Sequence, residues 1–460
     1  MWDDALSYIG MRDTWGGQQP FGISPTARRQ HLFLIGQTGT GKSTLIRNLI
    51  LQDIEKGYGV GLIDPHGDLA EDIIDAIPPP RTDHVAYFNP ADRDFPVGFN
   101  VLRAGSGQAP HLVASSIVGT LKGIWRDSWG PRTEYILYAC IAALEECDNV
   151  TILGVQRMLG DPRYRAWVVR QVRDPMVRAF WQGEFAGYDR RFLSEVIAPV
   201  QNKIGQLVMA PPIRHILGQV RSSIDIRFLM DHRRIFIANL AKGRIGEDKA
   251  NLLGSLLVTQ FQLAALSRAD IPLARRKTFH LYVDEYHNFA TDSFASILSE
   301  ARKYGLSLTL ASQYTSQTRP EVIDAVFGNV GTIASFRVGE SDADILARQY
   351  GEDIQPYHFT SLSNHHILVK PLTSDGYAFP FRAVTMQPLK LRSGRRRIII
   401  ARSRERFATK CSIVESRIQR WMGQTKSTHA KKSRYMHATT RIHTKQQQKQ
   451  RVPPPHLRTA

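Results

Sequence analysis

Residues 36–44 read GQTGTGKST, which matches the pattern G-x-x-x-x-G-K-[ST]. Glycines at these positions let the backbone curl without Cβ clashes, so that successive N–H groups point at a phosphate. Lys42 reaches the outer phosphate oxygens, and the hydroxyl of Ser43 binds Mg²⁺. The predicted nucleotide-binding residues are Gly36, Gln37, Thr38, Gly39, Thr40, Gly41, Lys42, Ser43 and Thr44.

The neighbouring sequence supports this prediction. Residues 31–35 (HLFLI) form a short apolar run that predicts a strand, and residues 44–54 (TLIRNLILQDI) have helical periodicity. The start of a helix adds a partial positive charge that favours phosphates. The sequence therefore predicts a strand, a phosphate-binding loop and a helix, with ATP and Mg²⁺ as ligands.

An acidic pair follows a second apolar strand. Residues 278–284 (TFHLYVD) end at Asp284, and Glu285 comes next. We expect Asp284 to hold Mg²⁺ through a water molecule and Glu285 to act as general base on the water that attacks the γ-phosphate. Such a pair is a weak signal alone, but together with the phosphate-binding loop it is a strong one.

Two further residues are candidates for the catalytic set formed by Lys42 and Glu285. The predicted strand 306–312 ends at Gln313, whose amide can sense the γ-phosphate and pass the signal to the polar residues 315–317. Arg302 lies on a predicted helix, 292–304. It is either a solvated structural residue or an arginine finger that reaches the nucleotide of a neighbouring subunit.

Three more polar residues follow the strand predicted at 58–64 (YGVGLID). Asp64, His66 and Asp68 would lie near the nucleotide because functional groups gather past the carboxyl ends of parallel strands. The alternative is a simple turn in which Asp68 caps the next helix. The roles of all three residues stay open.

The order of strands and helices predicts an α/β fold with an all-α insertion. A chain of 460 residues, 42% of them hydrophobic, is long enough for two or three domains. The expected parts are a loop-like lead-in (1–30), two halves of the α/β domain (31–107 and 229–389), an all-α insertion (108–228), a basic helix (390–422) and a disordered basic tail (423–460). Residues 367–371 and 378–383 are predicted as closing edge strands.

Positive charge is concentrated at the C-terminus. Residues 390–460 hold 20 of the 60 Lys and Arg and only 2 of the 42 Asp and Glu, so 40 of each sign remain in residues 1–389. Within this basic region, residues 403–422 are predicted as one amphipathic helix. The tail beyond it either contacts DNA phosphates or an anionic membrane surface, or has no fixed partner.

Three cysteines without metal-ligand spacing predict reduced thiols and a cytoplasmic location. No apolar run reaches the ~18 residues that a membrane span needs, and the N-terminus does not read as a signal peptide.

The stretch from 21 to 102 resembles the HerA–FtsK superfamily of P-loop DNA-translocating ATPases. Within that superfamily it is most similar to coupling-protein and DNA-transfer ATPases of type IV secretion. The segments that carry the resemblance include FGISPTARRQHLFLIGQTGTGKSTL, GYGVGLIDPHGDLAEDII, FPVGFNVL, LYVDEYHNFA and EARKYGLSLTLASQYTSQ. Together with IFIANLAKGRIGEDKANLLGSLL and SRERFATKCSIVESRIQRW, they extend it over most of residues 20–422.

The resemblance implies a RecA-like motor domain that assembles as a homo-hexameric ring around DNA. On matching positions it implies that Arg302 is the arginine finger and Gln313 the strand-end glutamine. Two departures stand out, since coupling proteins usually carry N-terminal transmembrane helices and HerA-type translocases an N-terminal β-barrel. Membrane recruitment, at the inner face of the cell membrane, would therefore need a partner.

Four functions are compatible with these patterns. The leading hypothesis is an ATP-driven DNA translocase of conjugative transfer, with a secretion channel or relaxase as partner. The alternatives are a repair or chromosome-processing translocase with a nuclease partner, a protein-secretion ATPase without a DNA substrate, and a nucleic-acid-binding scaffold with negligible turnover. The sequence leaves open the DNA strand form, the polarity, the ring size and the role of the insertion.

Overall fold

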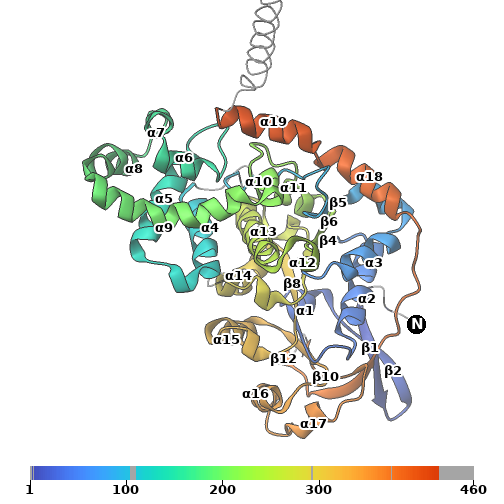
Figure 1. Ribbon diagram of the computed structural model, residues 1–460. Helices are drawn as coiled ribbons and strands as arrows, with labels where there is room; N and C mark the ends of the chain where they lie inside the picture. The colour runs from blue at the N-terminus through green and yellow to red at the C-terminus, as the bar shows by residue number, and fades with distance from the viewer. Residues whose placement is uncertain (1–2, 4, 104–109, 292–293, 374–375, 424–460) are drawn as a thin grey trace, which may run out of the picture. The chain divides into compact units, whose positions relative to one another are not determined.

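Figure 1 shows the computed structural model of the chain. The structure describes all residues except 1–2, 4, 104–109, 292–293, 374–375 and 424–460. It divides into two compact units, residues 1–411 and residues 412–460. The first unit contains the sheet and the site described below, and the described part of the second is most of helix α19 (Cys411–Trp421).

An eleven-stranded sheet organises the first unit, in the order β2-β1-β13-β10-β9-β3-β8-β7-β4-β6-β5. The strands from β9 to β5 run parallel, and the other four pair antiparallel. Their bounds are β1 Ser7–Thr14, β2 Gly17–Ile23, β3 Leu32–Ile35, β4 Gly59–Asp64, β5 Val85–Phe88, β6 Ile235–Asn239, β7 Phe279–Val283, β8 Leu306–Ser312, β9 Thr332–Ser335, β10 His366–Lys370 and β13 Phe381–Thr385. Strands β11 (Leu372–Thr373) and β12 (Gly376–Tyr377) form a separate small hairpin. The predicted α/β fold is confirmed.

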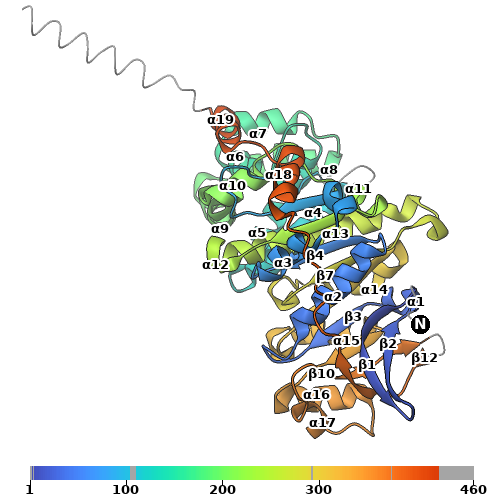
Figure 2. The same cartoon turned by 90° about the vertical axis from the view of Figure 1, so that its right-hand side faces the viewer.

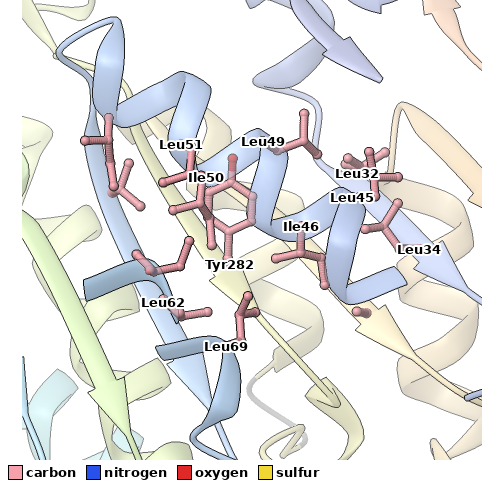
Figure 3. Close-up of a cluster of buried hydrophobic side chains, with 14 of the residues drawn as sticks. Leu32, Leu34, Leu45, Ile46, Leu49, Ile50, Leu51, Leu62, Leu69 and Tyr282 are labelled. Atoms are coloured by element: carbon pink, nitrogen blue, oxygen red, sulfur yellow. The ribbon is translucent and has the colours of Figure 1, made fainter. Parts of the chain in front are cut away.

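Helices cover both faces of the parallel strands (Figure 2). On one face lie α2 (Lys42–Glu55) and α3 (Asp68–Ala76), packed on the residues of β3, β4 and β6 that point toward them. On the other face α13 (Glu247–Ser267) packs Phe261 against Phe236 and Phe279. Figure 3 shows the first interface, where Leu45, Ile46, Leu49 and Ile50 of α2 are buried. Each such side chain contributes about 1.5–3 kcal/mol by leaving water.

The remaining helices of the parallel region follow the strands in turn. They are α1 (Pro25–Arg28), α12 (Lys242–Ile245), α14 (Phe294–Glu300), α15 (Pro320–Asn329), α16 (Glu340–Tyr350) and α17 (Tyr357–Thr360). A buried ion pair ties the first of them to α2, because Nη2 of Arg28 lies 2.9 Å from Oδ2 of Asp53. The same Nη2 donates to the hydroxyl of Tyr282 on β7 at 2.8 Å.

Between β5 and β6 the described chain is helical. The α-helices are α4 Pro110–Ile124, α5 Pro131–Glu145, α6 Gly154–Gly160, α7 Pro162–Val169, α8 Pro175–Ala179, α9 Arg190–Met209, α10 Pro211–Leu217 and α11 Ile226–Asp231. Their starts have local causes: Asp161, Asp174, Asp189 and Asp225 accept backbone N–H groups at the first turns of α7, α8, α9 and α11. One helix among the described residues, 247–270, is apolar and long enough to span a membrane, but 83% of its apolar window is buried within the protein.

The prediction that residues 1–30 form a loop was wrong. Strands β1 and β2 form a hairpin whose turn contains Gly17 at a φ of 100°. Strand β1 pairs with β13, so close that a Cβ on Gly10 would lie 2.1 Å from the carbonyl oxygen of Val384. Pro20 and Gly22 suggested a loop, but β2 is the outermost strand, where a proline costs no ladder hydrogen bond.

Two predictions near the C-terminus also need correction. Strands β10 and β13 were predicted as sheet edges, but both lie inside the sheet, because the N-terminal hairpin covers β13. The single helix predicted at 403–422 is two helices, α18 (Arg396–Phe407) and α19. Ala408 separates them, since it is extended and forms an antiparallel bridge with Val97. The predicted disordered tail lies outside the described residues from 424 onward.

Candidate nucleotide-binding site

The phosphate-binding loop joins β3 to α2 at the carboxyl edge of the parallel strands. Its glycines adopt positive φ angles, 79° at Gly39 and 118° at Gly41. At Gly41 there is also no space for a side chain, because a Cβ would lie 2.8 Å from Nδ1 of His365. The loop thus has the left-handed turns that the glycine spacing predicts.

Lys42 points back into this loop. Its ammonium donates to the carbonyl of Gly36 and, at 3.2 Å, to that of Gln37, and the residue is 7% exposed. Burial lowers the pKa of Lys42, whereas the charges of Glu285 and Asp284 raise it. The cation is therefore held between the loop and the two acids, where outer phosphates of a nucleotide would lie.

Asp284 and Asp64 lie at the ends of the neighbouring strands β7 and β4. Burial, followed by repulsion from Asp64 and Glu285, raises the pKa of Asp284 to about 7. A buried carboxylate beside other acids, with the exposed Ser43 hydroxyl on the first turn of α2, supplies the oxygen ligands that Mg²⁺ prefers. The residues predicted for the metal therefore fit it.

Asp64 also has a structural task. Its two carboxylate oxygens accept the backbone N–H groups of His66 at 2.8 Å and Ala70 at 2.9 Å, so it fixes the turn into α3. His66 and Asp68 are exposed. Asp68 is the first residue of α3, and the cap position belongs to Gly67, so Asp68 does not cap this helix.

The two carboxylate oxygens of Glu285 have different surroundings. Gln313, at the end of β8, donates its side-chain N–H to Oε1 of Glu285 at 2.9 Å. The other oxygen, Oε2, is buried and accepts no hydrogen bond from the described residues. It lies 3.4 Å from Nδ1 of His287, without hydrogen-bond geometry. One oxygen is thus oriented by an amide, and the other can accept a proton.

Arg302 is not part of this cluster. It lies in the turn Ala301–Tyr304, which precedes β8 and therefore sits at the amino edge of the parallel strands, opposite the phosphate-binding loop. The side chain is exposed and donates to Oε1 of Gln30 at 3.4 Å. Within one chain, Arg302 and Lys42 therefore lie at opposite ends of the parallel strands.

Two residues beside the loop were missed in the sequence. The carbonyl of Arg337, which follows β9, accepts the N–H of Gln37 at 2.9 Å, and its side chain lies 3.4 Å from Oε1 of Gln37. His365 donates its backbone N–H to the carbonyl of Thr40 at 2.8 Å. The only available signal for Arg337 was a cation at the end of an apolar strand, and His365 had none. His287 was missed too, although it follows the acidic pair by two residues.

Comparisons with known proteins support this reading of the geometry. Residues 17–102 match the family model described as "Helicase HerA, central domain". This stretch begins at β2 and includes the phosphate-binding loop, β4 and β5. No curated protein matches the sequence.

Solved structures match over most of the chain. The bacterial conjugative coupling protein TrwBdeltaN70, in its unbound monoclinic form, is 14% identical with a TM-score of 0.56, covering 83% of this chain and 90% of its own. The plasmid coupling protein TrwB in complex with ADP and Mg²⁺ is 17% identical with a TM-score of 0.54, covering 80% and 88%. VirB4 of Thermoanaerobacter pseudethanolicus is 14% identical with a TM-score of 0.54, covering 84% and 98%. At these identities the likeness shows a shared fold.

The sheet and the phosphate-binding loop together define the fold of a P-loop NTPase. Strand β3, which leads into the loop, is separated from β7, which ends before the acidic pair, by β8 alone. The match to the HerA central domain makes this more specific. Residues 17–102 are similar to that family, and most of the chain shares the fold of the coupling protein TrwB and of VirB4, in agreement with the resemblance noted in the sequence.

Proposed function

We propose that this protein is an ATP-hydrolysing DNA translocase that acts in conjugative or type IV secretion DNA transfer as a homo-hexameric ring. The observation that carries the proposal is the hydrogen bond from Gln313 to Glu285. It joins the general base to a segment, 313–317, that emerges at the same edge of the sheet. Hydrolysis and movement of this segment are therefore linked through one contact.

The residues divide the chemistry among them. Lys42 holds the outer phosphates, and Oε2 of Glu285 takes the proton of the attacking water. Ser43 and Asp284 would hold Mg²⁺, which when bound neutralises charge on the phosphate oxygens. The amide of Gln313 fixes the orientation of Glu285. A movement of the Gln313 side chain would therefore turn the Glu285 carboxylate toward or away from the attacking water.

The segment that follows Gln313 is suited to contact a substrate. Thr315 anchors it, because its N–H and hydroxyl both donate to Oδ1 of Asp342, at 2.9 and 2.6 Å. Tyr314, Ser316 and Gln317 are exposed on either side of this anchor. A hydroxyl and an amide can bind a DNA backbone without reading its sequence, which is what a translocase requires.

The position of Arg302 supports an oligomer. An exposed arginine at the sheet edge opposite its own phosphate-binding loop cannot act on its own nucleotide. It can act on the nucleotide of a neighbour in a ring, as an arginine finger does. Residues 1–389 have no net charge, so we infer that grip on DNA comes from local contacts, with the basic tail raising the local DNA concentration.

The deciding experiment is the steady-state ATPase rate with double-stranded DNA, with single-stranded DNA and without DNA, at ~100 mM salt. Severalfold stimulation is the expected result, and the preferred strand form separates transfer from duplex pumping. The Gln313→Ala variant, in which no amide orients Glu285, should hydrolyse ATP more slowly than the unaltered chain and lose most of the stimulation by DNA. A robust rate that ignores DNA would refute the proposal and favour a protein-secretion ATPase.

A further inference from the structure

A basic cavity lies at the edge of the sheet opposite the nucleotide site. Its volume is about 280 Å³, and Tyr58, His280 and the backbone just before β7 form part of its wall. It is lined by the start of β1, by helix α1 and Arg29 ahead of β3, and by residues just before β4, β6 and β7. Because these strands run parallel, the cavity and the phosphate-binding loop are at opposite ends of the same strands.

Cations dominate this lining. The six that contribute are Arg28, Arg29, Arg233, Arg275, Arg276 and Lys277. Among the described lining residues there is no aspartate or glutamate. One of the six, Arg28, forms a buried ion pair with Asp53. Among the described residues, none of the other five cations forms an ion pair.

Several of these cations have side-chain N–H groups that make no hydrogen bond within the described structure. Among the described residues, no hydrogen bond or ion pair engages the side chains of Arg29, Arg275 or Lys277. Arg28 is fully buried, and its Nε N–H has no hydrogen-bond partner in the described structure. Arg276, in contrast, is held in place by the carbonyls of Ile271 and Lys303. The cavity therefore combines a fixed, buried part with free cationic groups at its rim.

The nearby positive charges lower the pKa values of neighbouring titratable groups. Burial, assisted by the charges of Arg28 and Arg29 and opposed by that of Asp53, lowers the pKa of His280 to about 4. Burial also lowers the pKa of Arg81, with Arg234 and Arg233 acting in the same direction. An anion in the cavity would relieve this repulsion.

We propose that this cavity binds a phosphate group, carried either by a soluble phosphate compound or by a lipid headgroup. Arginine guanidinium groups match the planar pairs of phosphate oxygens, and several converging on one cavity provide both charge and geometry. The volume suits one or two phosphate groups and excludes a duplex. Leu273, 69% exposed in the loop that supplies three of the cations, could enter the apolar layer beneath a headgroup. The proposal is independent of the function proposed above.

The test uses the full chain with the P-loop site disabled, so that pyrophosphate cannot bind there. In the Lys42→Ala background, calorimetric titration with inorganic pyrophosphate should detect one site. The added substitutions Arg29→Ala, Arg275→Ala and Lys277→Ala should weaken binding at least tenfold. A matched control removes three exposed arginines elsewhere, Arg170, Arg190 and Arg191, and should change binding less than twofold. Thermal melting checks that every variant folds.

A second arm distinguishes the sources of the phosphate. Vesicles of phosphatidylcholine with phosphatidic acid should sediment the protein, and less of the cavity variant, if a headgroup is the ligand. Pyrophosphate binding without vesicle binding supports a soluble ligand. Equal weakening in the cavity and control variants, or no titratable site in the Lys42→Ala background, would overturn the proposal. Loss of DNA binding in the cavity variant without any pyrophosphate site would also overturn it and assign the cations to nucleic acid.

Discussion

The buried pair of Arg28 and Asp53 gives a sharp stability prediction. Both side chains are at most 1% exposed, and Oδ2 of Asp53 accepts from both Arg28 and Tyr282. The Asp53→Asn substitution keeps the shape but removes the negative charge, and it leaves the guanidinium buried without its counter-ion. Breaking such a pair costs about 3–5 kcal/mol. Because the amide oxygen can still accept hydrogen bonds from Arg28 and Tyr282, we expect the lower end of this range, about 3 kcal/mol.

The assay is urea unfolding followed by far-UV circular dichroism. Tryptophan fluorescence would be less suitable, because the buried Trp181 reports on the helical segment and not on the sheet. The matched control is Asp148→Asn. The side chain of Asp148 is 92% exposed, and its Oδ1 lies 3.3 Å from Nη2 of Arg103. This control should cost at most about 1 kcal/mol.

Two results would refute the reasoning about this pair. One is a loss in Asp53→Asn no larger than that of the exposed control. The other concerns the double substitution Arg28→Met with Asp53→Leu, which leaves no buried charge. It should be less destabilising than Asp53→Asn alone, and a larger loss would mean that packing, not charge, dominates this position.

The other predictions concern the site, the tail and acid stability. Lys42→Ala should abolish binding of a fluorescent nucleotide analogue, and retained tight binding would move the phosphate site elsewhere. Glu285→Gln should bind ATP but hydrolyse it at least about a hundredfold more slowly, and a near-normal rate would exclude Glu285 as the base. Deletion of residues 423–460 should flatten the salt dependence of DNA affinity, and an unchanged slope would leave the tail without a DNA role. Burial lowers the pKa values of His31 and His280 to about 4, so the unfolded chain takes up protons first as the pH falls below about 6.5. The urea midpoint should therefore drop between pH 7 and pH 4, less steeply in His280→Leu, and identical profiles would contradict this account.

Sequence reasoning succeeded where the determinant is local. The phosphate-binding loop, α2 and the apolar strand before Asp284 are each specified by consecutive residues, and the structure has them within a few positions. The contact between Gln313 and Glu285 needs one more fact, the adjacency of β7 and β8, which no local pattern contains. Whether the site residues perform their predicted roles stays a prediction.

The failures share a different cause. The N-terminal hairpin and the interruption at Ala408 both depend on pairing with residues several hundred positions away in the chain. Prolines and glycines in the first 30 residues have the same local preferences in a loop and in an edge strand, so composition cannot separate the two. The basic cavity is likewise assembled from five separate segments, and its charges are scattered in the sequence.

The pairing of β1 with β13 has a consequence for how the protein is made. During synthesis β1 leaves the ribosome well before its partner β13 (Phe381–Thr385), because Gly10 pairs with Thr385, 375 residues later in the chain. Until then Tyr8 and Ile9, which are buried in the finished fold, lack part of their cover, and β1 presents an open edge to other chains. This part of the sheet can therefore form only after β13 has been synthesised. Prematurely terminated chains should be prone to aggregation for this reason.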